Sequence, residues 1–242
     1  LCFTLAAPIA SFGAVAGNMA RGTLDRPGHS LVVGLIGAAL GLEREDPRLL
    51  EMSDGLRVAV EMDAPGSHLR DYHTVQTAKE RRGFRPATRR QALLEGELGT
   101  IITERDYLTD VCAFAAVMRE AGPFPLDEMA QALRTPRFTL YLGRKSCPLA
   151  LPVAPQVRQA ASIGAALRDH AAEHGERFRA LFPLHRRSMP VAADSRLYPA
   201  SAPGRRVRRR TATDDRGAWR YRLLEELVLD VPPSNADGEA IQ

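Results

Sequence analysis

The alternation of strand-like and helix-like patterns in residues 1–153 constrains the fold of this chain most. Residues 1–5 form a short apolar run that indicates a buried strand. Helical spacing follows in residues 31–41, where Ser30 is the expected N-cap and Gly41 is expected to end the helix. Residues 56–63 then place three apolar side chains on one side, the period of a half-buried strand: Val58, Val60 and Met62.

A second series of elements follows a polar, Arg-rich tract at about residues 78–104. Residues 107–118 indicate a strand with four side chains on one face: Leu108, Cys112, Phe114 and Met118. Residues 126–133 have the spacing of an amphipathic helix, and residues 138–142 indicate a short last strand. The order predicts an α+β fold, a ferredoxin-like βαββαβ unit of the RNA-recognition type, with a hairpin inserted between its second and third strands.

The last third of the chain differs in composition, and we therefore divide the sequence. Residues 1–153 are the expected ferredoxin-like RNA-binding domain with its insertion at about 78–104. Residues 154–233 form a smaller basic C-terminal part, with an Ala-rich helical pattern near its start and an apolar stretch, a strand or a helix, near its end. Residues 234–242 are expected to be a disordered tail.

Basic residues are clustered rather than spread evenly. The net charge is only +4, but the cations gather at residues 79–90, at Arg144 and Lys145, and at residues 205–210. Such patches are typical of a nucleic-acid partner. The tract at 205–210 is equally compatible with a solvated surface.

The three cysteines, Cys2, Cys112 and Cys147, are widely spaced and form no Cys-x-x-Cys pair. This favours reduced thiols in a cytoplasm, and it argues against a disulfide scaffold or a structural zinc site. The longest apolar run, residues 31–42, is too short to span a bilayer, so no membrane association is expected.

One pattern suggests a metal site. His170, Glu173 and His174 match H-x-x-E-H, the inverted zinc-peptidase pattern, which would place both histidines on one helix face. A third ligand would have to come from a few downstream glutamates: Glu225, Glu226 and Glu239. We interpret the pattern as a chance match on a solvated helix face, and we expect no metal and no cofactor.

The stretch Gly143-Arg144-Lys145-Ser146 ends like a phosphate-binding loop of nucleotide hydrolases. It lacks the first glycine of that motif, and an arginine stands directly before the lysine. Nucleotide hydrolysis is therefore not expected. A short loop with a glycine, two cations and a hydroxyl can still bind a phosphate group, although a solvated turn has the same composition.

Residues 70–74 place several ionisable and hydroxyl side chains close together. His73 could act as a general base on an RNA 2′-hydroxyl, with Lys79 or an arginine stabilising the phosphorane. That arrangement would make a metal-independent ribonuclease. The alternative is that His73 belongs to a hydrogen-bonded structural network.

The Arg-rich tract predicts an extended arm. Its guanidinium groups could lie along a nucleic-acid backbone, where they contact phosphates and stack on bases, or the tract could be a disordered charged loop. The arginines in question are Arg81, Arg82, Arg85, Arg89 and Arg90.

Four stretches, in this order, resemble the CasD family of the type I-E CRISPR Cascade complex. They are residues 31–46, 70–74, 105–110 and 136–148, of which the last, PRFTLYLGRKSCP, is the most specific. The resemblance covers residues 1 to about 153. The chain departs from the family at two places: Phe12-Gly13 stands where the family has Trp-Gly, and Gly28-His29 stands where it has Thr followed by a cation. The loss of that cation weakens the expected RNA contact of the loop before the first helix.

The resemblance implies a ferredoxin-like fold with a thumb hairpin and a non-catalytic role. Members of this family hold the 5′ handle of the CRISPR RNA, contact the CasC backbone subunits and the large CasA subunit, and meet target DNA only through the complex. Another subunit, CasE, cuts the guide. A related branch does cleave the guide precursor, so a ribonuclease remains an alternative, as does a protein-bridging subunit without RNA contact.

Residues expected to contact RNA come from the first helix, the arm and the glycine loop. They are His29, Ser30, Tyr72, His73, Thr74, Lys79, Arg81, Arg82, Arg85, Arg89, Arg90, Tyr107, Gly143, Arg144, Lys145 and Ser146.

Overall fold

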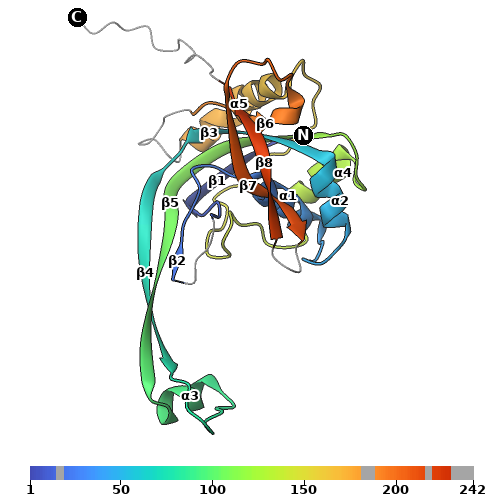
Figure 1. The fold of residues 1–242 in the computed structure, drawn as a ribbon. Coiled ribbons are helices and arrows are strands. Elements are labelled where there is room, and N and C mark those ends of the chain that lie inside the picture. The colour runs from blue at the N-terminus through green and yellow to red at the C-terminus, as the bar shows by residue number, and fades with distance from the viewer. Residues whose placement is uncertain (15–18, 181–188, 216–219, 230–242) are drawn as a thin grey trace, which may run out of the picture.

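The computed structural model describes residues 1–14, 19–180, 189–215 and 220–229. One mixed sheet runs through the molecule in the order β1-β5-β3-β6-β8-β7, and β2 and β4 also pair with β5 (Figure 1). The strands are β1 (Cys2–Ala10), β2 (Ala20–Arg21), β3 (Leu56–Ala64), β4 (Ser67–Ala78), β5 (Leu98–Arg119), β6 (Ala192–Asp194), β7 (Arg205–Asp215) and β8 (Arg220–Val228). Apart from the parallel pair β2–β5, the pairings are antiparallel.

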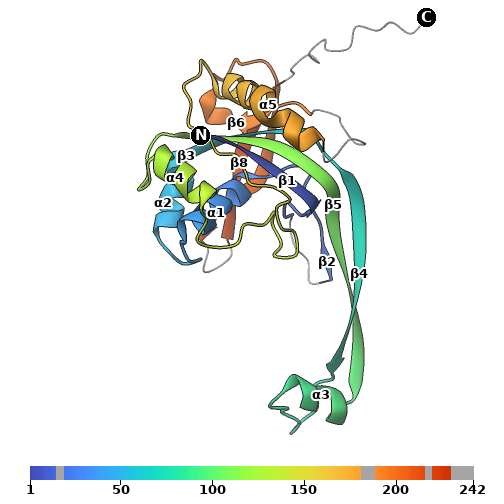
Figure 2. The same cartoon turned by 180° about the vertical axis from the view of Figure 1, so that it is seen from behind.

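Helices cover both faces of this sheet. The helices are α1 (His29–Leu40), α2 (Arg48–Gly55), α3 (Arg89–Glu95), α4 (Leu126–Arg134) and α5 (Ile163–Arg179), with a 3-10 turn at Ser195–Leu197. Helices α1, α2 and α4 pack together on one face, and α5 crosses the opposite face (Figure 2). No helix in the described part of the chain is both long and apolar enough to cross a bilayer.

The period-two pattern of β3 explains how one strand serves both layers. Val58, Val60 and Met62 belong to the core beneath α1, while Ala59 belongs to the core beneath α5. The alternation follows the predicted period, but β3 is buried on both faces, so the prediction of a half-buried strand is wrong.

The same pattern in β5 is interrupted at Asp110. Cys112 and Phe114 face α5, but Leu108 lies in the core on the α1 side. The backbone of Asp110 is left-handed, with φ of 54°. This irregularity reverses the alternation, so the expected single face from Leu108 to Met118 is wrong.

Two further predictions of local structure need correction. Helix α1 begins at His29 with Gly28 as its N-cap, so Ser30 lies in the first turn and caps nothing. Residues 138–142 form no strand, because the chain turns back at Gly143 and leaves one isolated bridge between Tyr141 and Pro148.

The outer edge of β1 is covered by residues 150–156 instead. The amide of Ala150 donates to the Ala6 carbonyl, the amide of Thr4 donates to the Val153 carbonyl, and Cys2 and Gln156 form a bridge.

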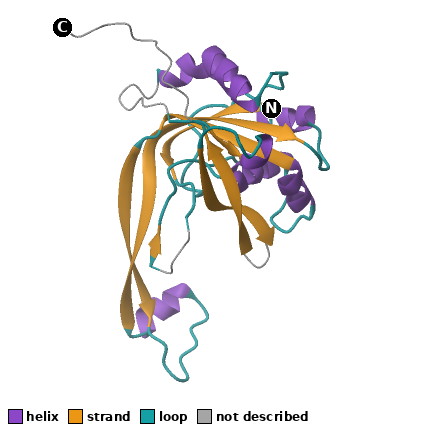
Figure 3. Ribbon diagram, turned by 45° about the horizontal axis from the view of Figure 1, so that its top comes forward, coloured by secondary structure: helices purple, strands orange, loops and turns teal. Residues whose placement is uncertain are grey.

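A hairpin arm, residues 67–109, projects from this body (Figure 3). Strand β4 pairs with the first half of β5 from Ser67 opposite Thr109 to Ala78 opposite Leu98, and α3 closes the tip. Eleven residue steps at about 3.3 Å give the paired strands a length of about 36 Å. The predicted insertion at 78–104 is thus the outer part of a longer hairpin.

The C-terminal residues complete the sheet. Strand β6 pairs with β3, and β8 and β7 extend the same sheet beyond it. The Ala-rich pattern forms α5, and the apolar stretch forms the end of β8. The predicted tail, residues 234–242, lies outside the described residues.

Candidate nucleic-acid interface

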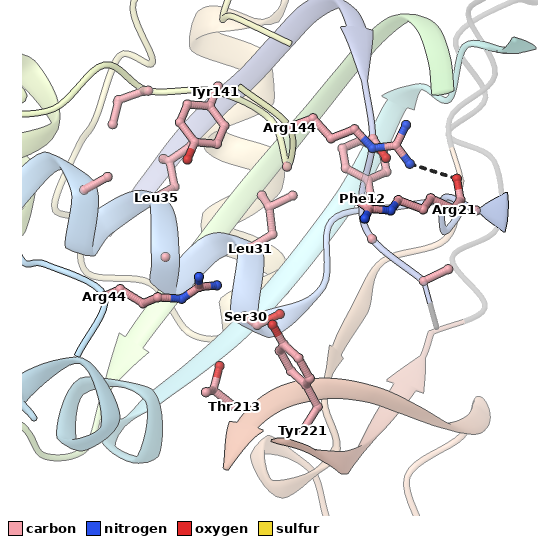
Figure 4. Close-up of a pocket in the computed structure, with 18 of the residues that line it drawn as sticks. Phe12, Arg21, Ser30, Leu31, Leu35, Arg44, Tyr141, Arg144, Thr213 and Tyr221 are labelled. Carbon is pink, nitrogen blue, oxygen red and sulfur yellow. Dashed lines mark hydrogen bonds between the residues drawn. The ribbon is translucent and has the colours of Figure 1, made fainter. Parts of the chain in front are cut away.

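A groove of about 460 Å³ lies along the exposed side of α1 (Figure 4). We call it the α1 groove. One face of α1 forms its floor, with residues at one-turn spacing: Ser30, Leu31, Gly34, Leu35 and Ala38. Its walls are the segment after β1, the loop at residues 139–144, and the β7–β8 hairpin.

Several arginine and aromatic side chains line this groove. The cations are Arg21, Arg44 and Arg144, and the aromatic residues are Phe12, Tyr141 and Tyr221. No aspartate or glutamate of the described residues lines it. A cationic groove with aromatic rings suits a single-stranded nucleic acid, whose phosphates need positive charge and whose bases need flat surfaces.

The glycine loop is held against the groove by its backbone. Gly143 has a φ of 85°, and a Cβ atom there would lie 1.6 Å from the Ser11 carbonyl oxygen. The amide of Ser11 donates to the Leu142 carbonyl at 3.1 Å. Lys145 and Ser146 follow on the exposed surface, as expected for a loop that binds phosphate.

Arg144 is committed to internal contacts. Its guanidinium group donates to the Asp106 carbonyl at 3.1 Å and to the Arg21 carbonyl at 2.8 Å. It also lies over the ring of Tyr107, 4.5 Å from the ring centre. Tyr107 is buried beneath it. The prediction that the Tyr107 side chain is free to contact RNA is therefore wrong, and Arg144 fastens the loop to β5.

His29 is also buried, so its predicted RNA contact is wrong. The side chain packs beneath the first turn of α1, where Nε2 lies 3.4 Å from the Leu56 carbonyl oxygen. Burial lowers the pKa of His29 from its ordinary value, which keeps the ring neutral. Ser30, one residue further on, does line the α1 groove.

The ionisable cluster at 70–74 is divided by the pleat of β4. Tyr72 and Thr74 face one side of the arm and His73 faces the other. His73 Nε2 lies 2.6 Å from an Asp71 carboxylate oxygen. Arg70 is paired with Asp106 at 2.7 Å. The five residues therefore do not form one site, although Tyr72 remains strongly exposed.

The basic tract at the arm tip is partly neutralised. Lys79 pairs with Glu97 at 2.5 Å, Arg89 donates to the Gln76 carbonyl, and Arg81 lies 5.6 Å from the centre of the Phe84 ring. Three exposed arginines make no hydrogen bond or ion pair with the described residues: Arg82, Arg85 and Arg90.

The arm tip and the glycine loop lie apart. Arg144 contacts β5 at Asp106, eight residues from the Leu98–Ala78 pair at the tip. At about 3.4 Å per residue, this is a separation of about 27 Å. The two basic groups therefore do not converge on one phosphate.

The H-x-x-E-H residues are occupied by internal contacts. His170 is fully buried and is hydrogen-bonded to Thr4 at 3.0 Å and to Gln156 at 3.3 Å. Burial, followed by the neighbouring His174 ring, lowers the pKa of His170 to about 4. Glu173 pairs with Arg158 at 2.9 Å.

The tract at 205–210 also contacts acidic partners. Arg206 and Arg208 pair with Glu225 across the β7–β8 hairpin, and Arg209 pairs with Asp25. These pairs fasten the hairpin, and Arg206 and Arg208 share one carboxylate.

Sequence reasoning missed most of the α1 groove. Arg21, Thr213 and Tyr221 are isolated polar residues in unremarkable stretches of sequence. Arg44 and Tyr141 lie in stretches that resemble family motifs, but nothing in the local pattern joins the five positions. The sheet order brings them together.

Comparisons with known proteins agree with the resemblance to the CasD family. A family model described as CRISPR-associated protein (Cas_Cas5) matches residues 1–224. The CRISPR system Cascade subunit CasD of Escherichia coli strain K12 is 32% identical over 187 residues, which is 73% of this chain and 79% of that protein.

Two solved structures have a similar fold. A chain of a CRISPR RNA-guided surveillance complex superposes with a TM-score of 0.59 and 26% identity, covering 94% of this chain and 88% of the other. The crystal structure of a Cas protein gives a TM-score of 0.53 at 23% identity, over 94% of each chain, and supports the fold alone.

Proposed function

Because the chain belongs to the Cas5 family of CRISPR-associated proteins, we propose that it is a non-catalytic subunit of an RNA-guided Cascade complex that binds and caps the 5′ handle of the CRISPR RNA. The observation that carries this proposal is the α1 groove. It combines the cationic side chains of Arg21 and Arg44 with the exposed rings of Tyr141 and Tyr221, and no acidic side chain of the described residues lines it.

The groove supplies the two kinds of contact that single-stranded RNA requires. Arginines can neutralise phosphates, and the apolar face of α1 with its aromatic neighbours can accept unstacked bases. Lys145 can add a positive charge and Ser146 a hydroxyl at the edge of the groove, because both are exposed directly after the lining residues Gly143 and Arg144. The handle would lie along α1 and leave past this loop.

The hairpin arm provides a second contact, about 27 Å from the first. Arg82, Arg85 and Arg90 are exposed at its tip, where they can meet a more distant part of the same RNA. We interpret the arm as the thumb of the family. We interpret the order β1-β5-β3, with α1 after β1 and α4 after β5, as the core of a ferredoxin-like unit.

Membership of such a complex implies protein partners as well. The CasC backbone subunits and the large CasA subunit are the proposed neighbours, and target DNA is met through the complex. The exposed apolar residues of the arm, such as Val75 and Ile101, suit contact with another protein. A cytoplasmic location is part of the same proposal.

The proposal is tested by binding of the purified chain to single-stranded RNA that carries the handle. The logarithm of affinity is measured against the logarithm of salt concentration for the wild type and for a triple substitution of Arg82, Arg85 and Arg90 to serine. Each lost phosphate contact should reduce the slope by about 0.7. A matched control replaces the ion-paired Arg206 and Arg208 with serine.

The expected result is a slope that is flatter by up to about 2 for the arm variant and nearly unchanged for the control. Preference for the handle over a scrambled RNA supports the capping role. A wild-type chain that binds neither RNA, yet assembles with partner subunits, would refute the proposal and favour a purely protein-bridging subunit.

A further inference from the structure

The β7–β8 hairpin places a tyrosine in the α1 groove. Thr213 of β7 and Tyr221 of β8 are register partners, and both line the groove (Figure 4). Tyr221 retains 37% of its exposure, whereas Thr213 is buried. The hairpin therefore presents one accessible aromatic ring to the groove, and it belongs to the C-terminal part to which the sequence assigns no role.

A second tyrosine enters the groove from the other side of α1. Tyr141, which is 40% exposed, stands above Leu35, and Tyr221 rises toward Ser30 (Figure 4). The floor between them has small or apolar side chains, including Gly34 and Ala38. An apolar floor bordered by two aromatic rings fits a flat, unstacked base better than it fits a phosphate.

Ion pairs dock the β7–β8 hairpin and hold the strand that carries Tyr221 against the rest of the protein. Arg209 pairs with Asp25 at 2.5 Å, and the buried Arg26 pairs with Glu226 at 3.3 Å. Arg222, the residue after Tyr221, is paired with an aspartate of α2. A strand that is already docked does not have to be ordered on binding, which lowers the conformational cost of stacking a base on its ring.

The charge of the groove indicates which kind of ligand it binds. Its lining carries arginines and, among the described residues, no acidic side chain, so an anionic chain is favoured over a neutral peptide. Its volume of about 460 Å³ lies within the range of pockets that hold a small molecule, and a single nucleotide is of that size.

We propose that Tyr221 stacks on one base of single-stranded RNA in the α1 groove, with Tyr141 as the opposite aromatic wall. This inference rests on the proposed function and deepens it. The C-terminal hairpin becomes part of the RNA site, and the groove holds a base while Lys145 and the arm hold phosphates.

The test places the fluorescent base 2-aminopurine at successive positions of a handle RNA and measures its emission on binding. Stacking on a tyrosine quenches this emission. One position should be quenched in the wild type and in Tyr221→Phe, and released in Tyr221→Ala. Leu223→Ala is the matched control, because Leu223 is an exposed apolar residue of the same strand outside the groove.

Tyr221→Ala should weaken RNA binding by roughly 5- to 150-fold, the range for loss of one base-stacking aromatic residue. Its salt slope should equal that of the wild type, because no charge is removed. Tyr221→Phe and Leu223→Ala should bind within about 2-fold of the wild type, and circular dichroism confirms that each variant is folded.

Two results would overturn the inference while leaving the proposed function intact. One is wild-type affinity and quenching in a folded Tyr221→Ala variant. The other is a loss of partner-subunit binding in that variant without any change in RNA binding, which would show that Tyr221 contacts a partner protein and not RNA. Failure of the proposed function gives a different signature, since the wild-type chain itself would then not bind the RNA.

Discussion

Arg144 and Lys145 are neighbours in one loop, but the structure predicts that replacing each by alanine changes a different property, stability for Arg144 and RNA affinity for Lys145. Arg144 donates two hydrogen bonds to backbone carbonyls and covers the Tyr107 ring. Lys145 is exposed and makes no ion pair with the described residues. Arg144→Ala should therefore reduce the stability of the protein, and Lys145→Ala should reduce its affinity for RNA.

The magnitude follows from the contacts. Two hydrogen bonds contribute about 1 kcal/mol each, and a partly exposed cation–π contact contributes about 0.5–1 kcal/mol. Loss of all three should lower the free energy of unfolding by about 2–3 kcal/mol. For a chain of this size, the thermal midpoint should fall by about 4–12 °C. Lys145→Ala should change the free energy by no more than about 0.5 kcal/mol.

The assay combines differential scanning calorimetry with the salt dependence of RNA binding. Arg144→Lys is the informative control, because it keeps the charge but loses the planar fork and the ring contact, and it should be nearly as unstable as Arg144→Ala. Lys145→Ala should flatten the salt slope by about 0.7. If Arg144→Ala leaves the thermal midpoint unchanged and flattens the salt dependence of RNA binding, this reasoning is refuted and Arg144 contacts RNA.

Three other predictions test the glycine loop, the nuclease alternative and the buried histidine. Gly143→Ala should destabilise the protein far more than Gly83→Ala, because both glycines have positive φ but only a Cβ at 143 would clash with Ser11; equal thermal midpoints would contradict the close approach of Gly143 to the Ser11 carbonyl. His73→Ala should leave guide-RNA processing intact, since its carboxylate partner Asp71 and its own side chain lie exposed on the arm, away from the α1 groove; accumulation of unprocessed precursor would favour the ribonuclease. Burial lowers the pKa of His170 to about 4, so the unfolded state takes up a proton at a higher pH than the folded state does. The free energy of unfolding should therefore fall as the pH drops from about 6.5 to 4, by at most about 3 kcal/mol. Urea unfolding at pH 7.5 and 4.5 should show a smaller loss for His170→Gln than for the wild type, and equal losses would contradict the assignment.

The sequence pattern predicted burial correctly where the burial of a residue depends on the period of its own strand or helix. Val58, Val60 and Met62 share a buried face as predicted, and α4 spans Leu126–Arg134, close to its expected range. In both elements the spacing of the apolar residues matches the period of the structure that forms, a strand buried on both faces and an amphipathic helix.

Prediction failed where long-range packing decided the outcome. Residues 138–142 have a strand-like composition, but the left-handed Gly143 turns the chain before a ladder can form. Residues 150–156 take the edge of β1 instead, although their prolines hide any period-two pattern. His29 was expected to contact RNA, yet the sheet and β8 enclose it.

The candidate site was predicted only in its sequence-local parts. The glycine loop and the arm are contiguous stretches, and they were visible as motifs. Arg21, Arg44 and Tyr221 come from three separate segments. Tyr221 reaches the groove because β7 packs beside α1 and β8 pairs with β7.

The pairing of β1 with β5 has a consequence for how the protein is made. The amide of Val117 donates to the Leu1 carbonyl, 116 positions earlier in the chain. At about 5–20 residues per second, a ribosome needs roughly 6–25 s to supply that partner. During this interval the apolar segment Cys2–Ala10 has no β5 to pair with, and pairing over such separations is itself slow. The nascent chain therefore exposes an unpaired apolar strand for seconds, an interval in which chaperones can bind it.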